Sequence, residues 1–386
     1  MNNAPLDMDV RFKRGEFSLN VQITAVGGIT ALFGRSGVGK STIVAILAGL
    51  LRPDEGSIRL GDHVLFDSAQ GIDIPPHLRG VGCVFQDARL FPHLSVTQNL
   101  TYGINRLNPS HRVSTYDRVV DLLGLKDLVS RRPLSLSGGE KQRVSIGRAL
   151  LSNPRFLLMD EPLANLDGKR KDEILPYIEH ICEAFSIPVI YVSHAIDEVI
   201  RLADTLVLLD SGQAVAQGTV EDIMGRLDLS PLTGRYEAGA VLNTTVLGHD
   251  HGVELTRLGV LGHTLFTPKI DLNTGQNIRL RLRARDISLA LGAVDGTSIL
   301  NQLPVVVKSI NMDNGPHVEL SLAITPDFEF EDNQPQIILA RITRKSFSAL
   351  NLAIGKPAHA LIKAVAIDRR SLGSFGKTNR RKQHPK

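Results

Sequence analysis

A glycine-rich segment near the N-terminus has the residues and spacing needed to bind phosphate groups. Residues 34–41 read GRSGVGKS and fit the pattern G-x-x-x-x-G-K-[ST], between an apolar run that predicts a strand (ITALF, residues 29–33) and a helical pattern over 42–51. Such glycines let backbone N–H groups converge on an anion, and the helix N-terminus favours negative charge. Lys40 would reach the β- and γ-phosphates of a nucleotide, and Ser41 would ligate Mg²⁺. The expected nucleotide-contacting residues are Gly34, Arg35, Ser36, Gly37, Val38, Gly39, Lys40, Ser41 and Thr42.

Two acidic residues follow a second apolar run. The segment FLLMD, residues 156–160, predicts a buried strand that ends in Asp160, and Glu161 comes next. At the carboxyl edge of a sheet, Asp160 could hold Mg²⁺ through water and Glu161 could act as a general base for an attacking water molecule. Alone this pattern is weak, because many buried strands end in solvated acids. Together with Lys40 it is typical of a nucleotide hydrolase.

The arrangement of apolar runs predicts an α/β first domain followed by a β-rich region. Up to about residue 230, buried strands (for example 189–193 and 205–212) alternate with helical patterns (142–151 and 170–185), as in a mainly parallel sheet. Beyond residue 236, segments with period-two alternation and intervening turn signals predict a barrel-like fold. We expect an ATPase-type α/β domain over 1–235, a β-rich connecting region over 236–295, a barrel over 296–368, and a basic, disordered tail over 369–386.

Composition excludes several classes of protein. A hydrophobic content of 42% excludes a wholly disordered chain, and two cysteines, Cys83 and Cys182, predict reduced thiols rather than a disulfide framework. The net charge of +4 arises from seven basic residues after position 368, so the folded body is close to neutral, which argues against a nucleic-acid-binding surface. Neither a signal peptide nor a membrane span is recognisable in the sequence, so we expect any membrane association to occur through another protein.

A third motif gives the chain a family resemblance. Residues 136–143 read LSGGEKQR, which resembles the signature of the ATP-binding cassette family. The resemblance implies that Ser137, Gly138 and Gly139 form a second phosphate-binding helix end. Two such ends in one chain suggest a head-to-tail homodimer, in which each ATP with its Mg²⁺ lies between Lys40 of one subunit and Ser137 of the other.

The same resemblance assigns roles to three more segments. Gln86 matches the glutamine that senses Mg²⁺ and the attacking water, and His194, after the 189–193 strand, matches the switch histidine that contacts the γ-phosphate. Asn165-Leu166-Asp167 matches the loop where two cassettes meet, although the family more often has a small residue in place of Asn165. For the aromatic residue that stacks on adenine, both Phe12 and Phe17 remain candidates.

A single cassette without membrane spans resembles the separate ATPase subunit of an importer. The segment DARLFPHLSVTQNL, residues 87–100, is similar to the importer segment that receives a permease. This implies a peripheral protein on the cytoplasmic face of the inner membrane, with permease subunits docking between Gln86 and Leu94 and a periplasmic oxyanion-binding protein as an indirect partner. The alternative for the apolar side chains Leu90, Phe91 and Leu94 is a role in the core.

The C-terminal region points to the cargo. TSILN (297–301), ARIT (340–343) and ALIKA (360–364) resemble the small barrel that binds molybdate and tungstate in molybdate importer ATPases. The resemblance implies an ATP-hydrolysing subunit for molybdate import, with Thr297, Ser298, Asn301 and Lys363 as candidate oxyanion ligands. Leu300 stands where that barrel often has arginine. The alternatives are an ATPase of a sulfate, sugar or iron importer, a barrel that only dimerises, a soluble oxyanion-binding protein, and a nucleic-acid ATPase.

Overall fold

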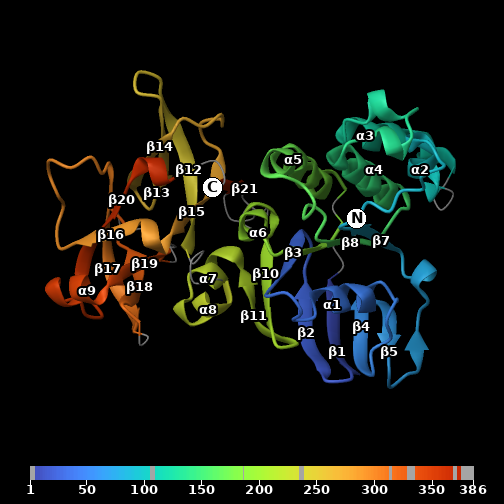
Figure 1. Cartoon of the computed structure of the whole chain (residues 1–386), viewed down its shortest axis with the longest axis horizontal. Helices are drawn as coiled ribbons and strands as arrows, with labels where there is room; N and C mark the ends of the chain where they lie inside the picture. Colours follow the sequence, from blue (N-terminus) through green and yellow to red (C-terminus); the bar gives the residue numbers. More distant parts are fainter. Residues whose placement is uncertain are drawn as a thin grey trace, which may run out of the picture. The chain divides into compact units, whose positions relative to one another are not determined.

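The computed structural model describes residues 5–104, 109–185, 187–233, 239–312, 315–327, 335–367 and 372–374. The chain forms two compact units, which divide between Gln217 and Gly218. Figure 1 shows the elements of each unit. Strands of the first unit are β1 (Leu6–Arg14), β2 (Phe17–Ala25), β3 (Ile29–Phe33), β4 (Glu55–Leu60), β5 (His63–Asp67), β6 (Ile72–Asp73), β7 (Val81–Phe85), β8 (Phe156–Asp160), β9 (Val189–Val192), β10 (Thr205–Asp210) and β11 (Gln213–Thr219).

The first unit is built on one mixed sheet with the strand order β6-β5-β4-β1-β2-β11-β10-β3-β9-β8-β7. Strands β10, β3, β9, β8 and β7 are paired in parallel, and β3, β8 and β9 are buried along almost their whole length, which explains their uninterrupted apolar sequences. Strands β1, β2, β4, β5 and β6 form the antiparallel part, where β1 and β2 alternate buried and exposed residues. The predicted α/β class is confirmed.

The helices of the first unit are α1 (Lys40–Leu47), α2 (Val96–Thr101), α3 (Pro109–Leu122), α4 (Gly138–Leu151), α5 (Gly168–Phe185) and α6 (Ile196–Leu202), with 3-10 turns at Pro76–Leu78, Lys126–Leu128 and Pro133–Ser135. Figure 1 shows α2, α3 and α4 grouped together, away from the antiparallel strands β1, β4 and β5. The prediction that the signature helix begins at residue 142 is wrong: α4 begins at Gly138, because Ser137 and Glu140 form a capping box that draws both glycines into the first turn. Among the described residues, no helix has the length and apolar character to span a bilayer.

The second unit consists of two five-stranded sheets with the orders β14-β13-β12-β15-β21 and β16-β20-β17-β18-β19. Strands β16 and β19, at the two ends of the second order, also lie close to each other, so this sheet curls toward a barrel as predicted. The elements are α7 (Val220–Met224), α8 (Ser230–Thr233), β12 (Gly239–Asp250), β13 (Leu255–Val260), β14 (His263–Pro268), β15 (Asn277–Arg283), β16 (Ile287–Ala290), β17 (Asn301–Asn311), β18 (His317–Ile324), β19 (Ile337–Thr343), α9 (Arg344–Ala349), β20 (Pro357–Ile362) and β21 (Leu372–Ser374), with 3-10 turns at Leu227–Leu229, Ala284–Asp286 and Ala364–Ala366.

One hydrophobic core serves both sheets of the second unit. Leu258 and Leu280 from the first sheet and Leu303 and Leu320 from the second belong to the same buried cluster. The side chain of Asn301, fully buried at the start of β17, strengthens the connection: its Nδ2 donates to the Phe266 carbonyl (2.9 Å) and its Oδ1 accepts from the Phe266 N–H (2.6 Å). The amide therefore imitates one rung of a β-ladder between the two sheets.

The two structural units divide between residues 217 and 218, whereas the boundary expected from the sequence lies between residues 235 and 236. Helix α7 belongs to the second unit, where Glu221 pairs with the buried Arg279 on β15 at 2.8 Å, and Ser230 donates to Glu319 on β18 at 3.0 Å. The period-two pattern that suggested the boundary begins only after these short helices. Within the predicted tail, residues 372–374 form β21 and pair with β15; the rest of 369–386 lies outside the described residues.

A buried arginine closes the C-terminal end of α1, the helix that follows the glycine-rich loop. Arg79 is 1% exposed and donates to the carbonyls of Ile46 (2.8 Å) and Leu47 (3.2 Å) and to Asp73 (3.0 Å). A cation at this end of a helix provides further donors to the terminal carbonyls, of which that of Ile46 also accepts from the Gly49 N–H at 3.0 Å, and complements the helix dipole. Gly49 leaves room for it, since an added Cβ would lie 2.7 Å from Arg79 Nε.

We expect Arg79→Ala to lower the free energy of unfolding by about 3 kcal/mol or more, because it removes a buried donor from the Ile46 and Leu47 carbonyls and leaves a cavity in its place. The matched control is Arg52→Ala, since Arg52 pairs with the same Asp73 at 3.7 Å but is 69% exposed; its effect should stay below about 0.5 kcal/mol. Urea denaturation followed by circular dichroism measures both, and equal shifts of the two midpoints would contradict the role given to Arg79.

Candidate functional site

The glycine-rich loop connects the end of β3 to the start of α1. Gly39 has a φ of 110°, a conformation that favours glycine, and an added Cβ there would lie 3.0 Å from the Phe17 ring. The loop, Phe17 and Glu161 enclose a pocket of about 230 Å³. Its lining comprises Phe17, Ser36, Gly37, Gly39, Lys40, Ser41, Thr42 and Glu161. The structure therefore brings most of the predicted phosphate-contacting residues together at one cavity.

Lys40 is the cation of this pocket. It is 6% exposed, and its Nζ donates to the carbonyls of Gly34 (2.7 Å) and Arg35 (2.9 Å), which holds the ammonium against the loop. Burial lowers the pKa of Lys40, while the nearby charges of Glu161 and Asp160 act in the opposite direction. A bound phosphate would add negative charge next to the ammonium and favour its protonated form.

Asp160 and Glu161 lie beside this lysine at the end of β8. Ser41 Oγ donates to Asp160 Oδ1 at 3.4 Å, and burial raises the pKa of Asp160, with Ser41 and Lys40 acting against that shift. A hydroxyl and a carboxylate are oxygen donors of the kind that Mg²⁺ prefers, and Mg²⁺ commonly completes its shell with water and substrate phosphate. The described residues contain no cluster of three or more acids, histidines or cysteines that could hold a metal alone.

Glu161 is held in an uncommon backbone conformation that directs it toward the pocket. Its φ is 47°, and its N–H donates to the Val192 carbonyl at 3.0 Å, which anchors it to the end of the neighbouring strand β9. Its Oε2 lies 3.3 Å from Nδ1 of His194, and His194 itself is largely exposed. The acid predicted as a base and the predicted switch histidine are thus neighbours.

Gln86 is not among the residues that line this pocket. Its side chain donates from Nε2 to Asn165 Oδ1 at 3.0 Å, and Asn165 Nδ2 in turn donates to Asp87 Oδ1 at 3.1 Å. The departure from the family pattern at Asn165 has a structural consequence: a longer amide replaces a small side chain and connects the two loops. Phe17 lines the pocket, whereas Phe12 is buried in the core beside β2, so the geometry favours Phe17 as the adenine-stacking residue.

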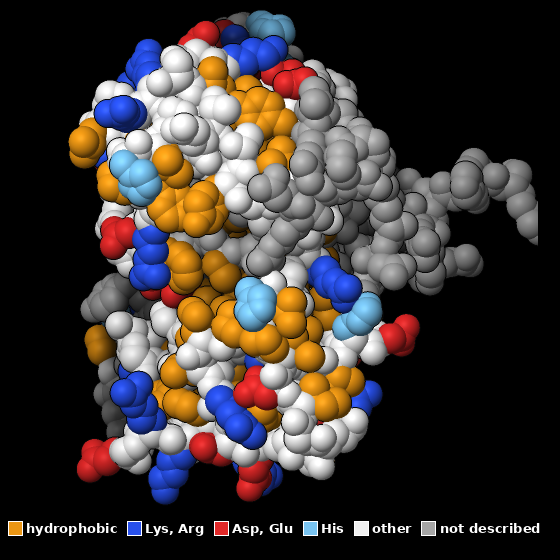
Figure 2. Space-filling view, turned by 90° about the vertical axis from the view of Figure 1, so that its right-hand side faces the viewer, with side chains coloured by type: hydrophobic (Ala, Val, Ile, Leu, Met, Phe, Trp, Pro, Cys, Tyr) orange, Lys and Arg blue, Asp and Glu red, His pale blue; other side chains and the backbone are white. Residues whose placement is uncertain are grey.

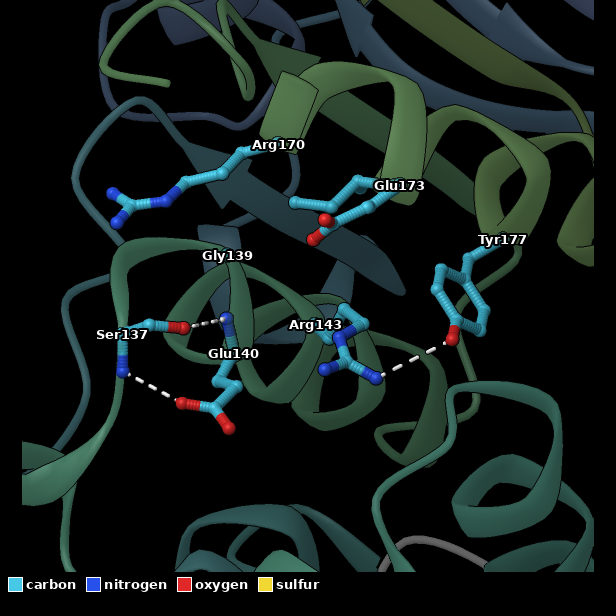
Figure 3. A pocket seen from close by; sticks show the side chains of 8 residues that line it. Ser137, Gly139, Glu140, Arg143, Arg170, Glu173 and Tyr177 are labelled. Carbon is cyan, nitrogen blue, oxygen red and sulfur yellow. Dashed lines mark hydrogen bonds between the residues drawn. The ribbon is translucent and has the colours of Figure 1, made fainter. Parts of the chain in front are cut away.

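The signature segment lies at a second pocket, of about 290 Å³, between the N-terminal parts of α4 and α5 (Figure 3). Ser137 caps α4: its Oγ accepts from the Glu140 N–H (3.3 Å), and its own N–H donates to Glu140 Oε2 (2.7 Å). The capping lowers the pKa of Glu140, chiefly through the bond from the Ser137 backbone. The pocket is lined by Ser137, Gly139, Glu140, Arg143, Arg170, Glu173, Ile174 and Tyr177, none of which lines the first pocket.

Part of this second pocket is made by residues that no motif in the sequence singles out. Arg170, Glu173 and Tyr177 follow one another at intervals of three and four residues, the spacing of one helix face, and this spacing could have grouped them. Figure 3 shows all three on α5, opposite the side chains of α4. Arg143 on α4 reaches across to donate to the Tyr177 hydroxyl at 3.4 Å.

The segment after Gln86 is neither core nor fully exposed. Leu90, Phe91 and Leu94 are all half-buried, and the ring of Phe91 lies 4.4 Å from that of Tyr102, which is 64% exposed. Arg148 supports the segment from α4, donating to the Arg89 carbonyl at 2.9 Å with its guanidinium over Phe91. Figure 2, which views this side of the molecule, shows hydrophobic side chains gathered at the surface among scattered charges.

The four candidate oxyanion ligands do not share one environment. Thr297 and Ser298 are exposed between β16 and β17, and Lys363 is exposed at the end of β20. Thr297 Oγ1 accepts from the Ile299 N–H at 3.3 Å. Asn301 differs from the other three, since it is buried and both polar atoms of its amide are engaged with Phe266.

Comparisons with known proteins agree with this geometry. The family model "ABC transporter" matches residues 18–164, and the model "TOBE domain" matches residues 297–368. The chain is 26% identical to cbiO1 of Clostridium perfringens, part of the ABC transporter complex cbiONQ, whose structure superposes with a TM-score of 0.52 over 60% of this chain and 94% of that chain.

Relatives with similarity over their full length identify the family more closely. "Molybdenum import ATP-binding protein ModC" of Paramagnetospirillum magneticum is 49% identical over 369 residues, which cover 96% of this chain and 99% of the relative. The protein of the same name from Rhodospirillum rubrum is 47% identical over 367 residues, which cover 95% of this chain and 98% of the relative. Because this similarity extends through both structural units, the chain belongs to the family of molybdenum import ATP-binding proteins, which are ATP-binding cassette proteins.

Proposed function

We propose that this chain is the ATP-hydrolysing subunit of a molybdate importer, and that it works on the cytoplasmic face of the inner membrane. The observation that carries the proposal is the meeting of Lys40, Ser41, Asp160, Glu161 and His194 at the ends of three neighbouring strands, in a chain that belongs to a molybdenum-import family. A sulfate, sugar or iron importer is less well supported, because the full-length relatives described above carry a molybdenum name.

The residues of the first pocket divide the work of ATP hydrolysis among them. The loop amides and Lys40 bind and orient the β- and γ-phosphates, and Phe17 supports the adenine. Mg²⁺, which Ser41 and Asp160 are suited to hold, neutralises charge on the phosphates when bound. Glu161 takes a proton from the attacking water, and His194, 3.3 Å from that carboxylate, lies where it can stabilise the transferring phosphate. Gln86, which is hydrogen-bonded to Asn165, connects the nucleotide pocket to the segment that follows Gln86 in the chain.

The two separate pockets support a head-to-tail homodimer. Ser137 and Lys40 line different cavities of one chain, which is the arrangement expected if an ATP molecule bound by the glycine-rich loop meets the signature helix of a second chain. The N-terminus of α4, where the Ser137 hydroxyl lies, is suited to bind the terminal phosphate.

The protein also has partners other than ATP. Permease subunits dock on the half-buried apolar residues between Gln86 and Leu94, and a periplasmic oxyanion-binding protein delivers cargo to the permease. Molybdate binds the second unit near Thr297, Ser298 and Lys363, whose hydroxyl, backbone and ammonium donors suit a tetrahedral oxyanion. Asn301 contributes by fixing the start of β17 next to them.

Replacing the general base tests the hydrolytic site. Glu161→Gln should bind ATP with an affinity close to that of the original chain but lower kcat by roughly 100-fold or more, because the amide cannot accept a proton from water. Filter binding and phosphate release measure the two quantities. Glu55→Gln, a carboxylate exposed on β4, is the control. Full turnover in Glu161→Gln would remove Glu161 from the mechanism.

Mixing two inactive variants tests the dimer. Lys40→Ala lacks the phosphate-binding cation, and Ser137→Arg blocks the signature end, so each alone should be nearly inactive. A mixed dimer regains one complete site, and turnover should rise to about a quarter of the original rate, since half of randomly mixed dimers are heterodimers with one intact site of two. A mixture no more active than its better component would contradict an ATP site shared between chains.

Calorimetry with the full-length protein tests the cargo. Molybdate should bind and sulfate should not, and the double substitution Thr297→Ala/Ser298→Ala should weaken molybdate binding about tenfold or more, because two oxyanion donors are lost. Thr274→Ala, an exposed hydroxyl in the turn before β15, is the matched control. Unchanged binding in the double variant would remove these two residues from the oxyanion site, and an absence of molybdate binding would leave the second unit without this ligand.

A further inference from the structure

A carboxylate on α6 is almost completely buried without belonging to the nucleotide pocket. Glu198 is 5% exposed and takes part in three hydrogen bonds. Its Oε2 accepts from the Tyr191 hydroxyl (2.9 Å) and the Ser193 hydroxyl (2.8 Å), and its Oε1 accepts from Lys171 Nζ (2.8 Å). A buried charge is costly unless it is paired and hydrogen-bonded in this way. We therefore expect Glu198 to have a role other than packing.

One of these bonds leads directly to the switch histidine. Ser193 donates to Glu198 and, through the same Oγ, accepts from the Ala195 N–H at 3.0 Å. Ser193 and Ala195 are the two chain neighbours of His194, so the backbone on both sides of the histidine is fixed by one hydroxyl. The imidazole of His194 is largely exposed. The buried carboxylate is thus connected, through one hydroxyl, to the backbone that carries this exposed ring.

Another bond extends the anchor to the loop that contains Asn165. Lys171 lies in the first turn of α5, directly after that loop, and its N–H donates to the Asp167 carbonyl at 3.0 Å. Asp167 Oδ1 caps the same turn by accepting from the Arg170 N–H at 3.0 Å. Glu198 thus connects the first turn of α5 to the His194 segment through two short bonds.

We propose that Ser193, whose hydroxyl is held by the buried Glu198, is a positioning residue that holds the His194 segment so that the imidazole stays next to Glu161. The inference rests on the proposed ATPase function and deepens it, since neither Glu198 nor Ser193 touches the pocket that holds the nucleotide. Lys171 supplies the charge that allows the carboxylate to remain buried, and it connects Glu198 to the first turn of α5.

Tyr191 provides an internal control for this proposal. Its hydroxyl donates to the same carboxylate oxygen as Ser193, and burial together with the charge of Glu198 raises its pKa, so it remains a donor. Tyr191 lies within β9, however, and its bond does not reach Ala195. Loss of the Tyr191 hydroxyl perturbs the buried network, while loss of the Ser193 hydroxyl also releases the His194 segment.

The experiment compares Ser193→Ala and Tyr191→Phe in the full-length protein, each with His194 intact and each combined with His194→Ala. With His194 intact, Ser193→Ala should lower kcat about tenfold and leave KM for ATP within about twofold, and Tyr191→Phe should change kcat by less than about twofold. With His194→Ala, Ser193→Ala should cause no further loss beyond about twofold, because its effect passes through the imidazole. Ser193→Thr, which keeps the hydroxyl, should restore the rate.

Amide hydrogen exchange gives a second readout that does not depend on activity. The Ala195 amide should exchange faster in Ser193→Ala and not in Tyr191→Phe. The proposal is overturned by equal losses of kcat with and without His194, by a loss in Tyr191→Phe as large as in Ser193→Ala, or by unchanged protection of Ala195. Failure of the proposed function is recognised separately: the original chain would lack ATP turnover, or His194→Ala alone would retain all of it.

Discussion

The candidate site depends on one constraint, that parallel strands end at a common edge. Strands β3, β9 and β8 are adjacent and in register, with Leu32 opposite Val192 and Val192 opposite Asp160. Because each strand is followed at once by a chemically active segment, residues far apart in the sequence meet there without a long loop to position them. The glycine-rich loop follows β3, the His194 segment follows β9, and Asp160 and Glu161 stand at the end of β8. Burial of the three strands makes this edge rigid, which suits groups that must hold fixed distances to a phosphate.

The charges at this edge suit it to a polyanion and a cation. Burial disfavours the charge on Lys40 and on Asp160, and each is partly stabilised by the other and by neighbouring groups. Triphosphate would supply the anionic partner for the lysine, and Mg²⁺ the cationic partner for the aspartate. Charges already buried and oriented need little reorganisation when the ligand arrives, and this is the electrostatic preorganisation on which phosphoryl transfer depends.

Local patterns in the sequence predicted the strands and the phosphate loop well, because both depend on residue type and spacing. The segments 29–33 and 156–160 form the expected strands, and the loop between β3 and α1 lies where the glycines indicated. Features that depend on tertiary contacts were harder to predict from the sequence. The choice between Phe12 and Phe17 depended on which ring faces the pocket. Asn301 was predicted to be an oxyanion ligand because its bond to Phe266, a residue distant in the sequence, could not be foreseen. Glu198 was missed since a lone acid in an amphipathic helix gives no signal of its burial.

The side chain of Asn301 also limits how the C-terminal domain can be exchanged between genes. The family model for the C-terminal domain covers 297–368, yet the core of that segment is shared with strands that precede it, and Asn301 is bonded to backbone in β14. A gene segment that began at residue 297 would encode the buried amide of Asn301 without its hydrogen-bond partners. It would also encode only part of the shared hydrophobic core. Recombination that exchanged this module between transporters would therefore retain a stable fold only when both sheets moved together, so the smallest transferable piece is larger than the sequence motif by which it is recognised.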